Sequence, residues 1–441
     1  MKIYYGGETK KALKNFPFST HSVKEDFILA VVKIKKAAAI SNFKSGNLDL
    51  KVKDAIIKSC DEILDKKHTE QFMMSSFQGG AGTAINMNIN EVIANRATEI
   101  LKNKIMVHAN DEVNCSQSTN DVNPSALKIS TFFLLKDLEL VLISSIKTLE
   151  NKSVEFKNIR KLGRTHIQDA IPTTLGAEFS AYVDNLKKHQ NRIKDILGMT
   201  SILNLGGTAI GDSVNASPKY IKDIYTELNK ITGFKFKRAD NLMAKTSSHT
   251  DFLIVSQYLV SLCVDLSKIA NDFRFMSSGP NGGIGEIILP ELQKGSSIMP
   301  GKINPVIPEA VNQLYYLVSG NNLMIEKAAE AAQMELGVMF PIIADKLLES
   351  IKLTTEILYQ FDKSCISGIK ANTEKCLFHL ENSTAYATLL VPRLGYDVVS
   401  EIVEKSLKTK RTLRDIVVGD NYLSEKEFDK IVSYGLKVIS H

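Results

Sequence analysis

Three long stretches of this 441-residue chain contain neither glycine nor proline, and they constrain the fold more than any other feature. They cover residues 125–162, 234–278 and 342–367. Strands usually run about 3–10 residues, so stretches of this length predict helices. In the first stretch, apolar residues recur at steps of three and four, as on one face of a helix: Leu135, Leu138, Leu142, Ile146 and Leu149. Because no period-two alternation is long enough for a large sheet, we predict an all-α fold.

The distribution of these stretches divides the chain into three expected domains. Residues 1–119 carry shorter helices, residues 120–374 carry a bundle of the longest helices, and residues 375–441 form a small, more charged helical domain. Between residues 258 and 273 the apolar positions cover most of the helix circumference, which indicates a helix surrounded by others. One thin bundle cannot bury every apolar face of such helices. We therefore expect several chains to associate through their central helices.

The charge pattern indicates an ordinary surface. The net charge of +6 comes from 55 basic and 49 acidic residues, 44% of all residues are hydrophobic, and the basic runs are short, as in 33–36 and 408–411. A nucleic-acid-binding protein usually gathers its basic residues on one face. We interpret the basic runs as solvated surface and expect no nucleic-acid partner.

Cysteine usage and the N-terminus favour a cytoplasmic protein. The five cysteines are odd in number and form no C-x-x-C pair, which indicates neither a disulfide framework nor a zinc site. The first residues lack the apolar stretch and cleavage site of a secretion signal. The most apolar long stretch, 252–275, contains Asp265, Lys268 and Asp272, and we interpret it as a buried helix rather than a membrane span.

Two polar clusters precede predicted helices. The first, 78–91, combines three glycines with Thr83, Asn86 and Asn88, so its backbone and side-chain N–H groups can hold an anion. A glycine-rich turn with asparagine caps is the plainer interpretation. The second, 116–121, places Ser118, Thr119 and Asn120 ahead of the longest helix, where they can cap the helix or donate to a carboxylate.

Two further clusters lie at residues 163–169 and 295–305. The first sets Thr165 beside His166, and the second contains Ser296, Lys302 and Asn304 among two glycines and two prolines. This second cluster cannot form regular helix and can close as a lid over a site. The chain has no nucleophile elbow, phosphate loop or pair of histidines at metal spacing. The residues alone therefore indicate loops that can converge on a small polyanion, and they leave the chemistry open.

The last cluster resembles the signature loop of the aspartase/fumarase superfamily. Nine positions match in register, Ser296-Ser-Ile-Met-Pro-Gly-Lys-Ile-Asn304. Blocks in the same order as in the family cover almost the whole chain: 4–6, 78–91, 116–121, 163–169, 206–211, 268–272 and 368–372. The run after the loop, 304–313, is more similar to aspartate ammonia-lyases than to class II fumarases.

The resemblance implies a fold and a reaction. The implied fold has three mainly helical domains, in a homotetramer with a twenty-helix core and active sites each built from three chains. The implied reaction is the reversible deamination of L-aspartate to fumarate and ammonia through an enediolate, without cofactor or metal. Such an enediolate must be stabilised by preorganised donors.

The residue roles that the resemblance implies follow the clusters. Ser296 matches the general base, and Asn120 is expected to contact the amino group. The remaining residues match positions that bind the two carboxylates: Thr83, Ser118, Thr119, Thr165 and His166 for the carboxylate next to the abstracted proton, and Lys302 and Asn304 for the other.

Several positions depart from the family pattern, and they keep other functions open. These positions are Lys11, Glu112, Asn281, Ala332, Gly337 and Val391. The alternatives are a class II fumarate hydratase, a related lyase that acts on a modified aspartate, and a catalytically silent member of the family.

Overall fold

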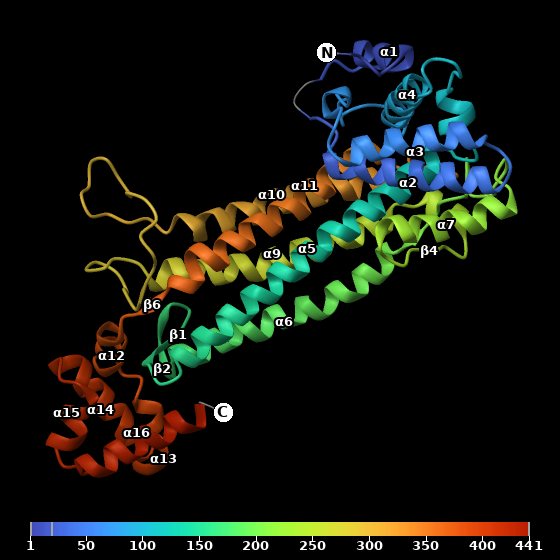
Figure 1. The fold of residues 1–441 in the computed structure, drawn as a ribbon. Helices are drawn as coiled ribbons and strands as arrows, with labels where there is room; N and C mark the ends of the chain where they lie inside the picture. The colour runs from blue at the N-terminus through green and yellow to red at the C-terminus, as the bar shows by residue number, and fades with distance from the viewer. Residues whose placement is uncertain (1, 19–20, 440–441) are drawn as a thin grey trace. The chain divides into compact units, whose positions relative to one another are not determined.

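The computed structural model describes residues 2–18 and 21–439, and the described part is mostly helical. Residues 1, 19–20 and 440–441, which belong to the first and third expected domains, lie outside the described residues. Figure 1 shows the helices and the few short strands. The prediction of an all-α fold is confirmed. The three-domain division remains a prediction.

The chain divides into two compact units. The first comprises residues 1–139, 191–261 and 316–355, and the second comprises residues 140–190, 262–315 and 356–441. Five unit boundaries fall inside long helices: α5 (Thr119–Glu155), α6 (Leu175–Thr200), α9 (Thr250–Met276), α10 (Val306–Glu330) and α11 (Phe340–Gln360).

The first unit also holds the N-terminal helices. These are α1 (Gly7–Asn15), α2 (Glu25–Lys44), α3 (Leu50–Leu64), the short η1 (Thr69–Gln71), α4 (Thr83–Ile100) and the π-helical η2 (Ala109–Val113). From the middle of the chain, the unit adds α7 (Pro218–Thr232) and α8 (Leu242–Ser247). Helix α2 packs against α3 and α7, and its buried residues cover most of its circumference. Phe27, Val31 and Ile34 are fully or almost fully buried, and such burial stabilises a helix much more than intrinsic propensity does.

Local sequence signals set the ends of these helices. Ser217 accepts the backbone N–H of Tyr220 at 3.2 Å and Pro218 occupies the first turn of α7. Gly233 ends the same helix in the left-handed conformation, with φ 72°. These are the start and stop signals that the residue types predict.

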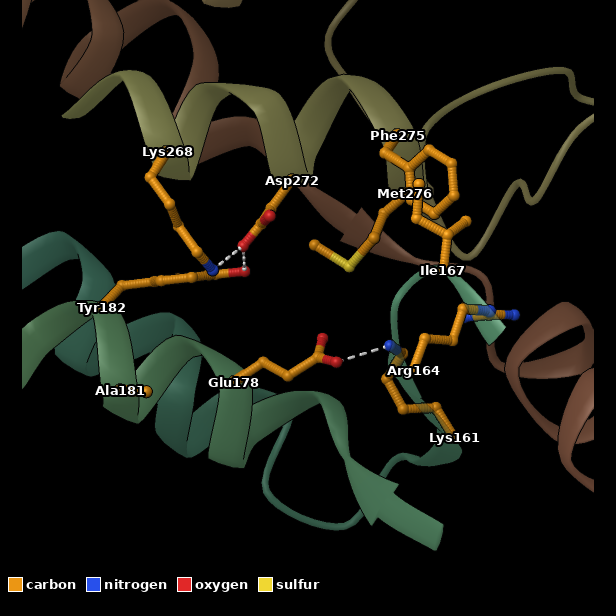
Figure 2. A pocket seen from close by; sticks show the side chains of 10 residues that line it. All are labelled: Lys161, Arg164, Ile167, Glu178, Ala181, Tyr182, Lys268, Asp272, Phe275 and Met276. Atoms are coloured by element: carbon orange, nitrogen blue, oxygen red, sulfur yellow. Dashed lines mark hydrogen bonds and ion pairs between the residues drawn. The ribbon is translucent and has the colours of Figure 1, made fainter. Parts of the chain in front are cut away.

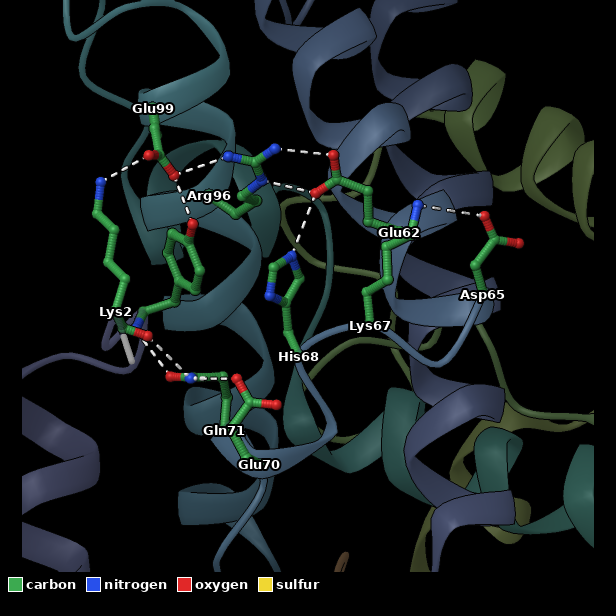
Figure 3. Close-up of polar contacts among 10 residues, drawn as sticks. Lys2, Glu62, Asp65, Lys67, His68, Glu70, Gln71, Arg96 and Glu99 are labelled. Carbon is green, nitrogen blue, oxygen red and sulfur yellow. Dashed lines mark hydrogen bonds and ion pairs between the residues drawn. The ribbon is translucent and has the colours of Figure 1, made fainter.

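Ion pairs anchor the N-terminal segment to the first unit. Arg96 donates to Glu62 at 2.6 Å and to Glu99 at 2.7 Å (Figure 3). The Tyr4 hydroxyl donates to Glu99 at 2.6 Å. Lys2 also pairs with Glu99, at 2.7 Å. This network holds the chain start against α3 and α4.

The second unit contains most of the strands and the C-terminal helices. Its strands form two small antiparallel pairs: β1 (Arg160–Thr165) with β2 (Gln168–Thr174), and β5 (Ile287–Ile288) with β6 (Lys370–Ala371). The first unit adds a parallel pair, β3 (Ile202–Leu203) with β4 (Lys237–Arg238). After the π-helical η3 (Phe361–Cys365) and the short η4 (Ile366–Gly368), the last helices form one group (Figure 1): α12 (Thr373–Glu381), α13 (Ala387–Leu394), α14 (Tyr396–Thr409), α15 (Leu413–Gly419) and α16 (Glu425–Ile439). These helices and Leu162 of β1 share an apolar core.

The long stretches without glycine or proline are helical in their centres and differ at their ends. Helix α5 ends at Glu155, and the last residues of the first stretch form strand β1 instead. The second stretch becomes one long helix only from Thr250. Helix α9 is long and apolar enough, by length and composition, to cross a membrane, so our exclusion of a span by composition was wrong. Core helices pass the same test, and 56% of its most apolar window is buried inside the protein.

Candidate active site

The nine residues predicted to act on the substrate fall in both compact units. Thr83, Ser118, Thr119 and Asn120 belong to the first unit. The second unit contains Thr165, His166, Ser296, Lys302 and Asn304. Each set is described within its own unit.

In the first unit, residues 118–121 form a turn at the start of α5, called here the hydroxyl turn. Ser118 precedes the helix, and its Oγ accepts the backbone N–H of Asn120 at 3.2 Å. Thr119 Oγ1 accepts an N–H from the side chain of Asn86 at 3.3 Å. Because each hydroxyl oxygen already accepts a hydrogen bond, its own O–H is available to donate. Both residues are half-buried, so the turn presents two oriented donors at the positive end of a helix.

A buried carboxylate holds the hydroxyl turn in place. Asp121 is fully buried, and it accepts backbone N–H groups from Ser118 at 2.9 Å, Gly206 at 2.9 Å and Thr208 at 3.1 Å. Burial raises the pKa of Asp121 to about 6, against the opposing effect of these donors. These hydrogen bonds bring residues 206–211 beside the 116–121 cluster, so the two segments can contribute to the same site.

Asn120 and Thr83 complete this part of the site. The Asn120 amide donates from Nδ2 to the carbonyl oxygen of Ala209 at 2.8 Å, which leaves Oδ1 as the end that can accept from an amino group. Thr83 is exposed at the start of α4, and its hydroxyl donates to the carbonyl oxygen of Gly80 at 2.7 Å. Thr83 must therefore rotate before it can donate to a substrate. Asn123 of α5 donates to the carbonyl oxygen of Gly82 at 3.2 Å, so the two clusters lie side by side.

Behind the hydroxyl turn lies a residue that the sequence interpretation missed. We interpreted the basic run 33–36 as solvated surface, and this was wrong for Lys35, which has no exposed area. Its Nζ donates to Oδ1 of Asn114 at 2.8 Å. Burial lowers the pKa of Lys35 to about 7, and nearby Asp121 opposes that effect. The missed signal was periodicity, because Lys35 follows the buried residues Val31 and Val32 by one helical turn.

In the second unit, Thr165 and His166 lie at the tip of the β1–β2 hairpin. Thr165 pairs with Gln168. His166 and Ile167 form the two-residue turn, with φ values of 54° and 62°, as in turns that match the twist of the strands. Both predicted residues are exposed. The turn therefore presents a hydroxyl and an imidazole outward.

Buried ion pairs support the base of this hairpin. Glu286 has no exposed area, and it pairs with Arg164 at 2.9 Å and with Lys161 at 3.1 Å. Lys161 also pairs with Glu178 of α6 at 2.6 Å. Neither glutamate was predicted from the sequence. Removing one partner of a buried pair leaves an uncompensated charge, so these contacts fix the residue next to Thr165.

A cavity of about 300 Å³ lies beside these pairs, and Figure 2 shows its lining. Its charged groups already pair with one another or with Glu286: Lys161 with Glu178, and Lys268 with Asp272. Asp272 also accepts the hydroxyl of Tyr182 at 2.7 Å. The cavity thus offers little unpaired charge to a dicarboxylate, and it is not our candidate for the substrate site.

Residues 295–304, called here the serine loop, contain the predicted base. Ser296 Oγ accepts the backbone N–H groups of Ile298 at 3.1 Å and Met299 at 3.2 Å. Two N–H groups directed at one hydroxyl oxygen stabilise negative charge on it. This geometry is what a serine needs in order to act as a base.

The serine loop is closed at its base and exposed over most of its length. The backbone N–H of Gly295 donates to the carbonyl oxygen of Lys302 at 2.9 Å, and Asn304 Nδ2 donates to the carbonyl oxygen of Gly295 at 2.8 Å. One donor of Asn304 is therefore engaged in closing the loop. Lys302 is exposed, and no ion pair within the described ranges involves it. No hydrogen bond or ion pair of the described residues joins this loop to the hairpin tip.

Comparison with known sequences identifies relatives over nearly the whole chain. A family model described as lyase matches residues 2–320, and a model of the fumarase C C-terminus matches residues 387–435. The chain is 41% identical to the aspartate ammonia-lyase of Bacillus subtilis (strain 168), over 98% of this chain and 92% of that protein. It is 40% identical to the aspartate ammonia-lyase of Escherichia coli (strain K12), over 98% and 91% of the two chains.

Solved structures show the same relationship. A crystal structure of a fumarate lyase:delta crystallin from Brucella melitensis bound to cobalt superposes with a TM-score of 0.94 at 40% identity, over 98% of this chain and 95% of that one. The recombinant class II fumarase from Schistosoma mansoni also gives a TM-score of 0.94, at 34% identity, with the same coverage. By sequence and by fold, the chain belongs to the aspartase/fumarase superfamily of lyases.

Proposed function

We propose that this protein is a carbon–nitrogen lyase that deaminates L-aspartate reversibly to fumarate and ammonia. The similarity to aspartate ammonia-lyases over nearly the whole chain supports this reaction. The structural observation that carries it is the pair of backbone N–H groups, from Ile298 and Met299, directed at Ser296 Oγ. A serine without such stabilisation is far too weak a base to take a proton from carbon.

The reaction follows from this base and from the oriented donors. The Ser296 oxyanion removes a proton from the carbon next to one carboxylate, and the electron pair delocalises into that carboxylate as an enediolate. The hydroxyls of Ser118 and Thr119 donate to it, and Thr83, Thr165 and His166 are the further donors. Collapse of the enediolate forms the double bond of fumarate and expels the amino group as ammonia, with Asn120 as its contact. Preorganised donors of this kind are usually the largest catalytic contribution.

The second carboxylate of aspartate needs an orienting group, and we assign this role to Lys302 and Asn304. An exposed lysine with no described ion pair is available to an anion. A cation held beside one carboxylate fixes the substrate relative to the base. The serine loop carries both the base and this cation, so one movement of the loop can place both.

We further propose that the protein is a cytoplasmic homotetramer, with each active site built from several chains and with the three domains expected from the sequence. Exposed apolar residues on the long helices support the assembly. Among them are Leu140, Val154, Ile254, Val264, Tyr316 and Leu323, each between 45% and 74% exposed. Exposed apolar residues that gather into one patch mark protein–protein contact. Sedimentation should give a mass of four chains, and a monomer under assay conditions would contradict the assembly.

Three of the positions that depart from the family pattern make no described contact with an assigned residue. Lys11 and Asn281 are exposed, and Glu112 accepts the backbone N–H of His108 within η2. None of these side chains has a described contact with an assigned residue. We therefore prefer an active enzyme to a catalytically silent family member.

The decisive experiment is a substrate panel with the purified protein. Fumarate should form from L-aspartate, and aspartate should form from fumarate with ammonia. Hydration of fumarate to malate without reaction on aspartate would replace the proposal with a fumarase. Reaction of fumarate only with substituted amines would replace it with a lyase for a modified aspartate.

A further inference from the structure

A chain of hydrogen bonds leads from the buried Lys35 to the hydroxyl of Thr119. Asn114 Oδ1 accepts from Lys35 Nζ at 2.8 Å, from Asn86 Nδ2 at 3.2 Å and from Asn90 Nδ2 at 3.3 Å. The other N–H of the Asn86 amide can then reach Thr119 Oγ1, at 3.3 Å. All of these residues belong to the first unit. This series of hydrogen bonds thus begins at Lys35 and ends at Thr119, a residue of the candidate site.

The direction of each bond follows from the chemistry of the lysine. Lys35 Nζ donates to Asn114 Oδ1, and in its ammonium form it can only donate, whereas an asparagine amide can present either its oxygen or its nitrogen. Lys35 therefore requires the oxygen of Asn114 to face it, and Asn114 Nδ2 donates at the other end to the carbonyl oxygen of Gln117, at 3.2 Å. An oxygen at this position in turn requires the N–H end of Asn86. Thr119 consequently receives a hydrogen bond and keeps its own O–H for another acceptor.

The cost of burying Lys35 indicates that it does more than pack. Its side chain has no exposed area, and no described ion pair involves its ammonium. A buried charge of this kind is expensive, and an apolar side chain of similar volume usually stabilises a core as well or better. Residues that break this rule are expected at functional sites.

The groups that face Lys35 are compatible with this role. Asp121 of α5 and Cys60 of α3 are the charged or titratable groups that act on its ammonium. Burial raises the pKa of Cys60 to about 12, so that thiol stays neutral near pH 7. Tyr220 of α7 is buried near Asp121, and burial raises its pKa as well. The ammonium therefore lies close to a single carboxylate, which already accepts three backbone N–H groups.

We infer that Lys35 is a positioning residue of the active site: through Asn114 and Asn86 it keeps the Thr119 hydroxyl turned toward the substrate carboxylate as a donor. The inference rests on the proposed function, since it names the group that orients one of the enediolate donors. Lys35 does not touch the substrate. It sets the direction of a hydrogen bond two side chains away.

The test compares Lys35→Met with the matched control Lys33→Met on the same helix. Lys33 is also partly buried, but its Nζ lies over the ring of Phe133, at 4.6 Å from the ring centroid. Lys35→Met should lower kcat for aspartate about 10-fold, the effect of one misdirected hydrogen bond to a charged group. It should raise KM less than 3-fold, which corresponds to roughly 0.6 kcal/mol of binding free energy. Lys33→Met should keep wild-type kinetics. A structural role would instead lower the thermal midpoint of Lys35→Met.

The variant Asn86→Asp tests the same series of hydrogen bonds independently of Lys35→Met. A carboxylate at this position only accepts, so Thr119 would donate to it instead of to the substrate. The loss of kcat should equal that of Thr119→Val. In this variant Asn114 Oδ1 loses the donor at position 86 but still accepts from Lys35 and Asn90. The result does not depend on how Lys35→Met folds.

A double-variant cycle decides whether Lys35 acts through Thr119. If it does, Lys35→Met combined with Thr119→Val should be no slower than Thr119→Val alone. Losses of kcat that multiply in the double variant would overturn the inference, and so would wild-type kinetics in Lys35→Met.

Binding of succinate, an unreactive C4 dicarboxylate, is measured by calorimetry on the same proteins. If the wild type binds succinate but leaves aspartate unchanged, the proposed function fails by itself. Lys35 is then judged by whether Lys35→Met weakens succinate binding about 3- to 10-fold, as a lost donor predicts.

Discussion

The hydroxyl turn and the serine loop are built in opposite ways. The turn is half-buried, each of its hydroxyl oxygens accepts a hydrogen bond, and a buried carboxylate and a buried lysine stand behind it. The loop is mostly exposed, and the bonds that close it involve Gly295, Lys302 and Asn304 at its ends. Donors for a developing charge must be fixed in advance, whereas the base must reach the substrate and then release the product. The difference indicates that the donors of the hydroxyl turn are fixed before the substrate binds. The serine loop, by contrast, moves to bring its base to the substrate.

The largest predicted effect is a loss of kcat that distinguishes two neighbouring serines of the serine loop. Ser296→Ala removes the oxygen that two backbone N–H groups stabilise, so kcat for aspartate should fall about 10³-fold, within the range for general bases. Ser297→Ala should stay close to wild type, since Ser297 is exposed and has no assigned role. Steady-state formation of fumarate measures both. Equal losses in the two variants would remove Ser296 from its role.

The next effect compares two threonines of the first unit. Thr119→Val deletes a donor that is already oriented, and kcat should fall about 10²-fold. Thr83→Val should cost only about 10-fold, because the Thr83 hydroxyl donates to Gly80 and must rotate before it can act. Kinetics on both variants test whether preorientation matters. The reverse order would contradict our account of the hydroxyl turn.

A smaller effect is expected at the base of the serine loop. A Cβ at Gly295 would overlap with the carbonyl oxygen of Lys302, so Gly295→Ala should disturb loop closure and lower kcat about 10-fold, roughly the effect of one lost hydrogen bond to a charged group. The thermal midpoint should stay unchanged, because an exposed loop adds little to stability. Gly282→Ala is the matched control, since nothing lies within 4 Å of a Cβ there. A large drop in the thermal midpoint of Gly295→Ala would show that the loop is part of the stable fold.

The smallest effect concerns stability and pH. Burial lowers the pKa of Lys35 to about 7, so the unfolded chain binds this proton more tightly than the folded protein. The folded state therefore gains stability as pH rises from about 7 toward the usual pKa of lysine. Lys35→Met should be more stable than wild type at pH 7, and the difference should shrink toward pH 10. Thermal midpoints of the wild type and of Lys35→Met across this pH range check the prediction, and a constant difference between them would contradict the account.

The sequence predicted the helices well where helix formation is local. Stretches without glycine or proline contain the centres of α5, α9 and α11. The ends were less predictable, because residues 160–162 pair with β2 and pack against the C-terminal helices, which are distant in sequence. Packing of so short a strand against helices distant in sequence leaves no periodic signal in the stretch itself.

The candidate site was predictable in its residue types and not in its supports. The polar clusters and the family resemblance led us to propose Ser118, Thr119 and Ser296, whereas Lys35 lay inside a basic run that resembles a surface. Glu286 carried no motif of its own, because its partners Arg164 and Lys161 lie more than a hundred residues earlier. Buried supports of this kind depend on contacts that only the folded chain brings together.

One departure from the family pattern has a packing explanation. Gly337 is one of the positions that depart from the family pattern, and the imidazole of His249 occupies the space that a side chain at this position would need. The His249 Nε2 lies 3.0 Å from the carbonyl oxygen of Gly337. The two positions form a matched pair in this chain, so the change at Gly337 reflects packing and does not argue against activity.

The most direct test of the central claim mixes two inactive variants. If the hydroxyl turn and the serine loop of different chains act on one dicarboxylate, Ser296→Ala and Thr119→Val chains assembled together should form some sites with both groups intact. Random mixing in a closed oligomer predicts roughly a quarter of wild-type activity toward aspartate, whereas each variant assembled alone should keep about a hundredth of it or less. Co-assembled oligomers that remain as inactive as the separate variants would contradict a site shared between chains.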